Sequence, residues 1–135
     1  MRILGNGVDI IENIRIKKAI KNKKFIYKIF KNKEKKFAKK KNVNKINYFA
    51  KRFVAKEAFL KAIGTGLSNG FSFKDITVLN DKKGKPYIES EKKIDLFIKK
   101  KFKVKNYKIF LSISDEMKYS IAYVILQGNS KWSGL

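Results

Sequence analysis

The longest regular pattern of hydrophobic and polar positions lies between Asn44 and Gly64. Apolar side chains recur there at helical spacing, no proline interrupts the segment, and its alanine, leucine, lysine and glutamate residues favour the helical state. Gly64 suits the left-handed position that often ends a helix. The pattern predicts one helix of about 20 residues, from near residue 44 to residue 63.

One charged residue interrupts the apolar side of this predicted helix. At about 100° per residue, a single stripe collects the apolar positions Ile46, Phe49, Ala50, Phe53, Val54 and Leu60. Glu57 falls inside the stripe, and Lys56 and Lys61 flank it. A buried carboxylate costs several kcal/mol unless it is paired, protonated or bound to a metal ion. Two interpretations are open: a pair with Lys61 at the edge of the core, worth about 0.3–0.5 kcal/mol if exposed, or a functional role.

The remaining pattern alternates short strands with helices. Before the central helix, it predicts a strand over residues 2–12 and short helices over 13–42, with breaks near Asn22 and Asn32. After the central helix come a loop over 65–75, a strand over 75–79, a turn over 80–84 and a return strand over 85–88. The chain then continues with a helix over 91–103 and a hairpin of strands 107–114 and 119–126, whose turn is at 115–118. This order indicates an α+β fold, with one long central helix packed on a mostly antiparallel sheet. We expect a single domain over residues 1–126 and a loose C-terminal tail over residues 127–135.

The first predicted strand contains two glycines and an aspartate. Glycine weakens a strand and often marks a close approach by a ligand or by another backbone, which applies to Gly5 and Gly7. Asp9 lies between Val8 and Ile10, so its side chain points to the opposite side of the strand from both. From the local sequence, Asp9 is either a solvated aspartate on an edge strand or part of a site.

Composition limits the chemistry that this chain can perform. It has 135 residues, 44% of them hydrophobic, which is enough for the core of one domain. It contains neither cysteine nor histidine, so disulfides, the usual zinc sites and histidine-based triads are excluded. Any acid–base chemistry must come from Asp, Glu, Lys or Tyr.

The net charge of +23 comes from 34 Lys and Arg against 11 Asp and Glu. This balance indicates a partner or substrate rich in phosphate or carboxylate groups. The alternative is codon bias in an AT-rich genome, because only Arg2, Arg15 and Arg52 are arginines while Lys, Asn and Ile are frequent.

No uncharged run exceeds 12 residues, whereas a membrane-spanning helix needs about 20. The apolar run at the N-terminus is too short for a secretory signal. We therefore expect a cytoplasmic protein without a membrane partner.

Three segments together resemble a known family. They are Gly5-Asn6-Gly7-Val8-Asp9-Ile10-Ile11-Glu12, Arg52-Phe53-Val54-Ala55-Lys56-Glu57-Ala58-Phe59-Leu60-Lys61-Ala62-Ile63-Gly64-Thr65-Gly66 and Gly84-Lys85-Pro86. The combination is similar to the holo-acyl-carrier-protein synthases, the small bacterial 4′-phosphopantetheinyl transferases, over about residues 2–126. The resemblance implies the 4′-phosphopantetheinyl transferase fold for this chain.

The resemblance also implies a reaction. Members of this family move the 4′-phosphopantetheine arm of coenzyme A onto a serine of apo acyl carrier protein in fatty acid biosynthesis, and release adenosine 3′,5′-bisphosphate. An Mg²⁺ cofactor is implied as well, held by Asp9 and Glu57, and this would explain a carboxylate inside the apolar stripe. Mg²⁺ takes few protein carboxylates and completes its shell with water and phosphate oxygens.

Catalytic roles follow from the same resemblance for Asp9, Glu57 and Lys61. Lys61 would hold a phosphate oxygen or shuttle a proton. The group that accepts the serine proton is either Glu57, through a metal-bound water, or a Lys61 of lowered pKa, and the sequence leaves both open. The coenzyme contacts are expected at Lys56, Lys61, Gly64, Gly84, Lys85, Pro86 and Ser114.

The family likeness implies two protein partners. One is a second copy of the chain, in a homotrimer with coenzyme sites between protomers. The other is the acidic acyl carrier protein, docked on the basic first helix with Arg15 at a docking position. Four further lysines would steer the carrier, an effect that salt weakens: Lys18, Lys21, Lys24 and Lys28.

One position departs from the family pattern. Family members usually carry Ser-x-Ser-His or Ser-x-Thr-His in the late strand, whereas this chain has Ser112-Ile113-Ser114-Asp115. An additional carboxylate near phosphates repels them unless a cation intervenes. We expect Asp115 either to turn outward or to add a water-mediated metal contact. The missing histidine also leaves an inactive family homologue open as an alternative.

A basic nucleic-acid-binding protein is the rival from a different class. The charge of +23 and the 13% aromatic residues favour it. No RNA-recognition signature is present, however, and the aromatic residues stand at core-like spacings. We therefore expect no nucleic-acid partner.

Overall fold

The structure, a computed structural model, describes residues 1–40 and 44–129 and contains two antiparallel sheets in that part of the chain. The larger sheet has the order β1-β5-β4, formed by β1 (Arg2–Glu12), β4 (Tyr107–Asp115) and β5 (Tyr119–Gly128). The smaller one is a hairpin of β2 (Ile76–Asn80) and β3 (Pro86–Ser90). The predicted α+β class and the mostly antiparallel pairing are confirmed.

The helices gather in three groups. Short helices α1 (Asn13–Ala19), α2 (Lys23–Ile29) and α3 (Asn32–Ala38) follow β1, and the predicted breaks near residues 22 and 32 are confirmed. The long helix α4 (Lys45–Ile63) runs through the middle of the molecule, and α5 (Lys92–Phe102) follows β3. A short 3₁₀ helix, η1 (Phe73–Asp75), lies in the expected loop. None of the described helices is long and apolar enough to cross a membrane.

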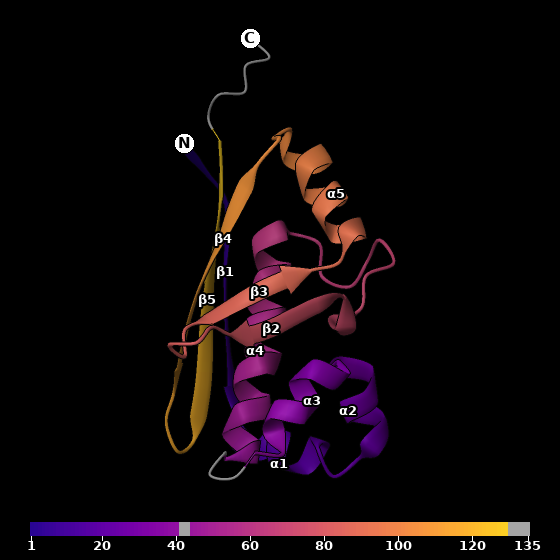
Figure 1. The fold of residues 1–135 in the computed structure, drawn as a ribbon, viewed down its shortest axis with the longest axis vertical. Helices are drawn as coiled ribbons and strands as arrows, with labels where there is room; N and C mark the ends of the chain where they lie inside the picture. Colours follow the sequence, from indigo (N-terminus) through magenta and orange to yellow (C-terminus); the bar gives the residue numbers. More distant parts are fainter. Residues whose placement is uncertain (41–43, 130–135) are drawn as a thin grey trace.

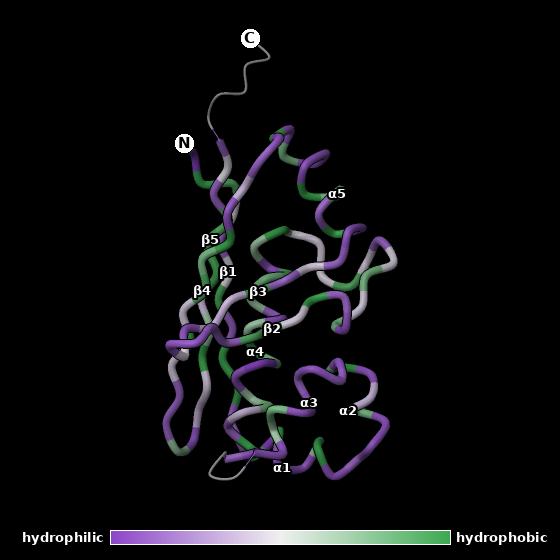
Figure 2. The backbone as a smooth tube through the Cα atoms, viewed as in Figure 1, coloured by the Kyte–Doolittle hydropathy of each residue, from purple (hydrophilic) through white to green (hydrophobic). Residues whose placement is uncertain are grey.

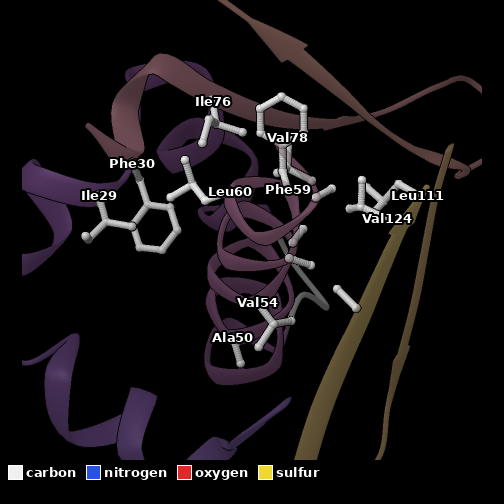
Figure 3. Packing of buried hydrophobic residues seen from close by; sticks show 14 of the residues in the cluster. Ile29, Phe30, Ala50, Val54, Phe59, Leu60, Ile76, Val78, Leu111 and Val124 are labelled. Atoms are coloured by element: carbon white, nitrogen blue, oxygen red, sulfur yellow. The ribbon is translucent and has the colours of Figure 1, made fainter. Parts of the chain in front are cut away.

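Helix α4 has the predicted ends but not the predicted single stripe. The Asn44 side chain accepts a hydrogen bond from Asn47 N at 3.2 Å, and Gly64 adopts a left-handed φ of 79°. The three-stranded sheet lies on one side of α4, and the β2–β3 hairpin and α2 lie on others (Figure 1; Figure 3). Because it is enclosed, α4 buries residues outside the stripe as well, among them Arg52 and Lys56.

The two strand glycines mark the approach of another backbone, that of α4. A Cβ atom on Gly5 would lie 2.0 Å from the Ala62 carbonyl oxygen, and one on Gly7 would lie 2.1 Å from that of Ala58. Only glycine allows β1 to lie this close to the helix. This contact fixes the position of α4 relative to β1, and therefore determines which residues of α4 lie opposite Asp9.

The core forms around α4. Phe30 and Leu60 pack on the side of α2, and Val124 and Leu111 pack on the side of the sheet (Figure 3). Phe30 also contacts Phe49, with ring centroids 4.7 Å apart.

The C-terminal boundary expected from the sequence is wrong by two residues. Gln127 pairs with Ile3 and Lys108, and Gly128 pairs with Arg2 and Tyr107, so both belong to β5. The rest of the predicted tail, residues 130–135, lies outside the described residues.

Candidate active site

Asp9, Glu57 and Lys61 come together where β1 crosses α4. Lys61 Nζ lies 3.2 Å from Asp9 Oδ1 and donates to Val8 O at 3.0 Å. The Asp9 side chain is 19% exposed and faces α4, whereas Val8 and Ile10 are exposed on the other face of the sheet. The predicted alternation is confirmed, and Asp9 is not a freely solvated edge residue.

Glu57 lies one helical turn before Lys61 and is half-buried. Burial raises the pKa of the Glu57 carboxyl above its ordinary value, the Asp9 carboxylate raises it further, and the Lys61 ammonium opposes both. The ion pair of Lys61 is made with Asp9. The interpretation of Glu57 as the partner of Lys61 at the core edge is therefore wrong.

The donor set formed by Asp9 and Glu57 fits a divalent cation. Burial and the neighbouring Asp9 carboxylate both raise the pKa of Glu57. A bound cation would reduce the repulsion between these two carboxylates. Within the described ranges, no group of three or more His, Cys, Asp or Glu is arranged to hold a metal ion. A cation here would take its other ligands from water and substrate, as Mg²⁺ commonly does.

A pocket of about 950 Å³ opens along the N-terminal half of α4. Four elements form its walls, and its lining residues are Phe37, Lys40, Asn44, Asn47, Tyr48, Lys51, Arg52, Asn80, Asp81, Lys82, Gly84 and Asp115. Cations outnumber carboxylates in this lining, so the pocket suits an anionic ligand. Arg52, in the lining, precedes Glu57 by five residues, a rise of about 7.5 Å along the helix axis.

Arg52 is the most constrained cation of this pocket. It is only 4% exposed, and its guanidinium stacks 3.8 Å from the centroid of the Tyr48 ring. Its Nη2 donates to Asn80 Oδ1, whereas its buried Nε has no hydrogen-bond partner among the described residues. Asn80 Nδ2 in turn donates to Gly84 O at 2.8 Å, which ties the hairpin turn to α4.

Asp115 closes another side of the pocket. Its Oδ2 accepts a hydrogen bond from Asn47 Nδ2 at 2.7 Å, and its Oδ1 lies 3.9 Å from Lys51 Nζ. The expectation that Asp115 turns outward is wrong, because it lies on the inner face of the sheet. The Asn47 amide satisfies one carboxylate oxygen, and the Lys51 ammonium offsets part of the negative charge.

Two expected coenzyme contacts lie elsewhere. Lys56 was expected to face phosphate, but it is fully buried and bonds to Glu34, so this prediction is wrong. Burial lowers the pKa of Lys56 to about 8, against the opposing effect of Glu34. Ser114 pairs with Ile121 on the outer face of the sheet, opposite Asp9.

The other expected contacts lie at the ends of the site. Gly84, with φ of 87°, lines the pocket at the hairpin turn, and Lys85 and Pro86 follow it outside the lining. Gly64 ends α4, three residues after Lys61. All five expected docking cations are exposed on α1, α2 and their connection, where hydrophilic residues predominate (Figure 2): Arg15, Lys18, Lys21, Lys24 and Lys28.

Arg52, Asn80 and Lys51 were not assigned a role from the sequence. One signal could have identified Arg52: it is one of only three arginines in a lysine-rich chain, and it stands inside the central motif. No comparable signal exists for Asn80, which reaches Arg52 only through the fold.

Comparison with known proteins shows the family of this chain. A family model of the 4′-phosphopantetheinyl transferase superfamily matches residues 5–124, so the chain belongs to that superfamily. It is 58% identical over 127 residues to a holo-[acyl-carrier-protein] synthase of Pelagibacter ubique, covering 94% of this chain and 98% of that relative.

Solved structures of holo-[acyl-carrier-protein] synthases have the same fold. The enzyme of Neisseria meningitidis is similar with a TM-score of 0.82 and 32% identity, covering 93% of this chain and 99% of that one. The enzyme of Bacillus anthracis, solved in complex with coenzyme A (3′,5′-ADP), is similar with a TM-score of 0.77 and 36% identity, covering 94% and 98%. The predicted family and fold are confirmed.

Proposed function

We propose that this protein transfers the 4′-phosphopantetheine group of coenzyme A to a serine of an apo acyl carrier protein, with Mg²⁺, and releases adenosine 3′,5′-bisphosphate. The observation that carries the proposal is the cluster of Asp9, Glu57 and Lys61 beside a cationic pocket on the same helix. The near end-to-end similarity to holo-[acyl-carrier-protein] synthases supports the same reaction.

The pocket suits the nucleotide of coenzyme A, and the cluster of Asp9, Glu57 and Lys61 suits its pyrophosphate. The nucleotide end, with its 3′-phosphate, would lie in the pocket, where the lining residues Lys51 and Lys82 can meet phosphate. The pyrophosphate would then reach Lys61. A cation held by Asp9 and Glu57 would supply neutralisation of the pyrophosphate charge.

Glu57 is the better candidate for the group that accepts the serine proton. Its carboxylate is a proton acceptor, whereas Lys61 donates hydrogen bonds to Val8 O and Asp9 and is placed to bind an anion. The serine oxygen forms a bond to the phosphorus that carries pantetheine as the phosphorus–oxygen bond of the pyrophosphate breaks. The serine proton passes to Glu57, directly or through water, and the leaving phosphate departs with the nucleotide.

The acyl carrier protein would dock on α1 and α2. The exposed cations there complement an acidic partner, and they face solvent rather than the core. Association should slow as salt is added, because screening shortens the reach of these charges to about 8 Å at physiological ionic strength.

The outer face of the three-stranded sheet supports assembly with further copies, as in the proposed homotrimer. Apolar side chains from all three strands are exposed on this face: Ile3, Val8, Ile10, Phe110, Ile121 and Tyr123. A contiguous apolar surface of this kind is typical of an interface. Light scattering should show a trimer, and Val8→Lys should shift it towards the monomer; a wild-type monomer would contradict this part of the proposal.

Intact-mass spectrometry tests the reaction. Apo acyl carrier protein, incubated with this protein, coenzyme A and Mg²⁺, should gain the mass of one phosphopantetheine. The gain should disappear with chelator and with Glu57→Ala, and persist with Glu89→Ala, which removes an exposed carboxylate of β3. A folded wild-type protein that binds coenzyme A but transfers nothing to several carriers would support the inactive homologue instead.

A further inference from the structure

Lys56 and Glu34 form an ion pair that is completely enclosed. Lys56 Nζ lies 2.8 Å from Glu34 Oε1, and both side chains are 0% exposed. The ammonium also donates to Ile29 O at 2.6 Å and to Phe73 O at 3.2 Å. Neither side chain lines the pocket or reaches the carboxylates of the active site, so the pair has no direct part in the proposed reaction.

Glu34, in α3, connects this pair to β2 and to the first turn of its own helix. Its Oε2 accepts a hydrogen bond from Val78 N in β2 at 3.0 Å, and its Oε1 accepts one from Lys31 N at 2.9 Å. Its own carbonyl accepts a hydrogen bond from the Tyr48 hydroxyl of α4 at 2.7 Å. One carboxylate group therefore fastens α3 and β2 to α4 with directional bonds.

The same three elements form walls of the anionic-ligand pocket. Phe37 lines it from α3, Arg52 from α4 and Asn80 from the end of β2. Arg52 lies one helical turn before Lys56, and Asn80 lies two residues after Val78. The Arg52–Asn80 bond and the Glu34–Lys56 network are thus two successive attachments of β2 to α4, one inside the pocket and one behind it.

A buried ion pair is a poor device for stability alone, because packed apolar side chains of similar size often stabilise a protein as well or better. Its bonds are directional, however, and they fix the spacing of the elements that they join. We propose that Glu34 and Lys56 are positioning residues for the pocket, which hold its α3, α4 and β2 walls at the separation that the nucleotide end of coenzyme A requires. This inference rests on the proposed function.

The test measures binding of adenosine 3′,5′-bisphosphate by calorimetry, at a temperature where circular dichroism shows every variant folded. Lys56→Met, which keeps much of the side-chain length and removes the charge, should raise the Kd at least tenfold. Glu34→Gln, which keeps the size and one acceptor oxygen, should raise it less and covers the case in which Lys56→Met does not fold. In steady-state kinetics, both should raise KM for coenzyme A more than they lower kcat.

Ile98→Ala is the matched control. Ile98 is fully buried in α5, which contributes no residue to the pocket, so its truncation should lower the melting temperature and leave the Kd unchanged. If Lys56→Met and Glu34→Gln also lose stability but bind like the wild type, the positioning role is overturned and the proposed function stands. If the wild type binds no bisphosphate, the assignment of the pocket fails, and the positioning role with it.

Discussion

Helix α4 carries two lysine–carboxylate pairs of opposite character. Lys61 and Asp9 meet at 3.2 Å with 54% and 19% of their side chains exposed, whereas Lys56 and Glu34 meet at 2.8 Å with neither exposed. The two lysines are five residues apart, and Glu57 follows Lys56 directly. A rotation of about 100° between neighbouring residues therefore separates a side chain of the site from one of the core.

The two regions differ in whether the protein itself supplies partners for every charged side chain. Lys56 donates to three protein oxygens, and Glu34 accepts from Lys56 and two backbone amides, so neither has capacity for a ligand. At the exposed pair, Glu57 faces Asp9 without an ion pair of its own among the described residues. Two neighbouring carboxylates repel each other, and binding of a cation from solution would reduce this repulsion.

The largest effect should come from neutralising the two carboxylates of the site, Asp9 and Glu57. Asp9→Asn and Glu57→Gln should each lower kcat/KM for coenzyme A by at least about 10³-fold, because charge neutralisation is the main source of catalysis in phosphoryl transfer. The free energy of unfolding should change by less than about 1 kcal/mol, as for other exposed pairs. Transfer to carrier and urea denaturation provide the two measurements.

Glu89→Gln serves as the control for both variants, since Glu89 is an exposed carboxylate of β3 that pairs with Lys33 at 3.6 Å. Activity close to that of the wild type in Asp9→Asn or Glu57→Gln would remove the cluster from the mechanism.

The buried pair should show the opposite balance. Lys56→Met leaves the Glu34 carboxylate without its cation in the core, which should lower the free energy of unfolding by about 3–5 kcal/mol. Lys61→Met, at the exposed pair, should lower it by less than about 1 kcal/mol. Equal losses in urea denaturation would show that burial does not distinguish the two pairs.

The sequence predicts the elements of this molecule better than it predicts which side chains they bury. The ends of α4 follow from Asn44, Gly64 and an unbroken helical pattern, and these are local signals. Lys56 is buried because it pairs with Glu34, which lies 22 residues earlier in the chain. The sequence gives no reason to place these two residues side by side.

The candidate site likewise has a part that the sequence predicts and a part that it does not. Asp9 and Glu57 stand in segments that resemble a known family, and their meeting depends on the close contact that Gly5 and Gly7 permit. The pocket depends on Asn80 reaching Arg52 and on Asp115 reaching Asn47, contacts between elements far apart in the chain. Spacing within a single segment carries no information about such contacts.

Gly7→Ala tests the contact that holds Asp9 against α4. The added Cβ would lie 2.1 Å from Ala58 O and 2.9 Å from Lys61 Cβ, so β1 must move away from the helix. Overpacking of this kind costs about 1–3 kcal/mol. Because Asp9 is two residues further along β1, kcat should fall as well, whereas Asn6→Ala, at an exposed neighbour, should change neither quantity. A variant with wild-type stability would show that β1 does not need this glycine.

The smallest effect should come from Asp115, a carboxylate at the end of β4 that lines the pocket. Asp115→Asn keeps an oxygen that can accept from Asn47 and removes a negative charge near the phosphates. The Kd for coenzyme A should therefore fall by about threefold, or about 0.6 kcal/mol, and the gain should shrink as salt screens the charge. Asp115→Ala removes the hydrogen bond together with the charge, and comparing the two variants separates these contributions. If Asp115→Asn does not tighten binding while Asp115→Ala weakens it, repulsion is not what Asp115 contributes, and the pocket resembles the buried pair in depending on bond geometry more than on charge.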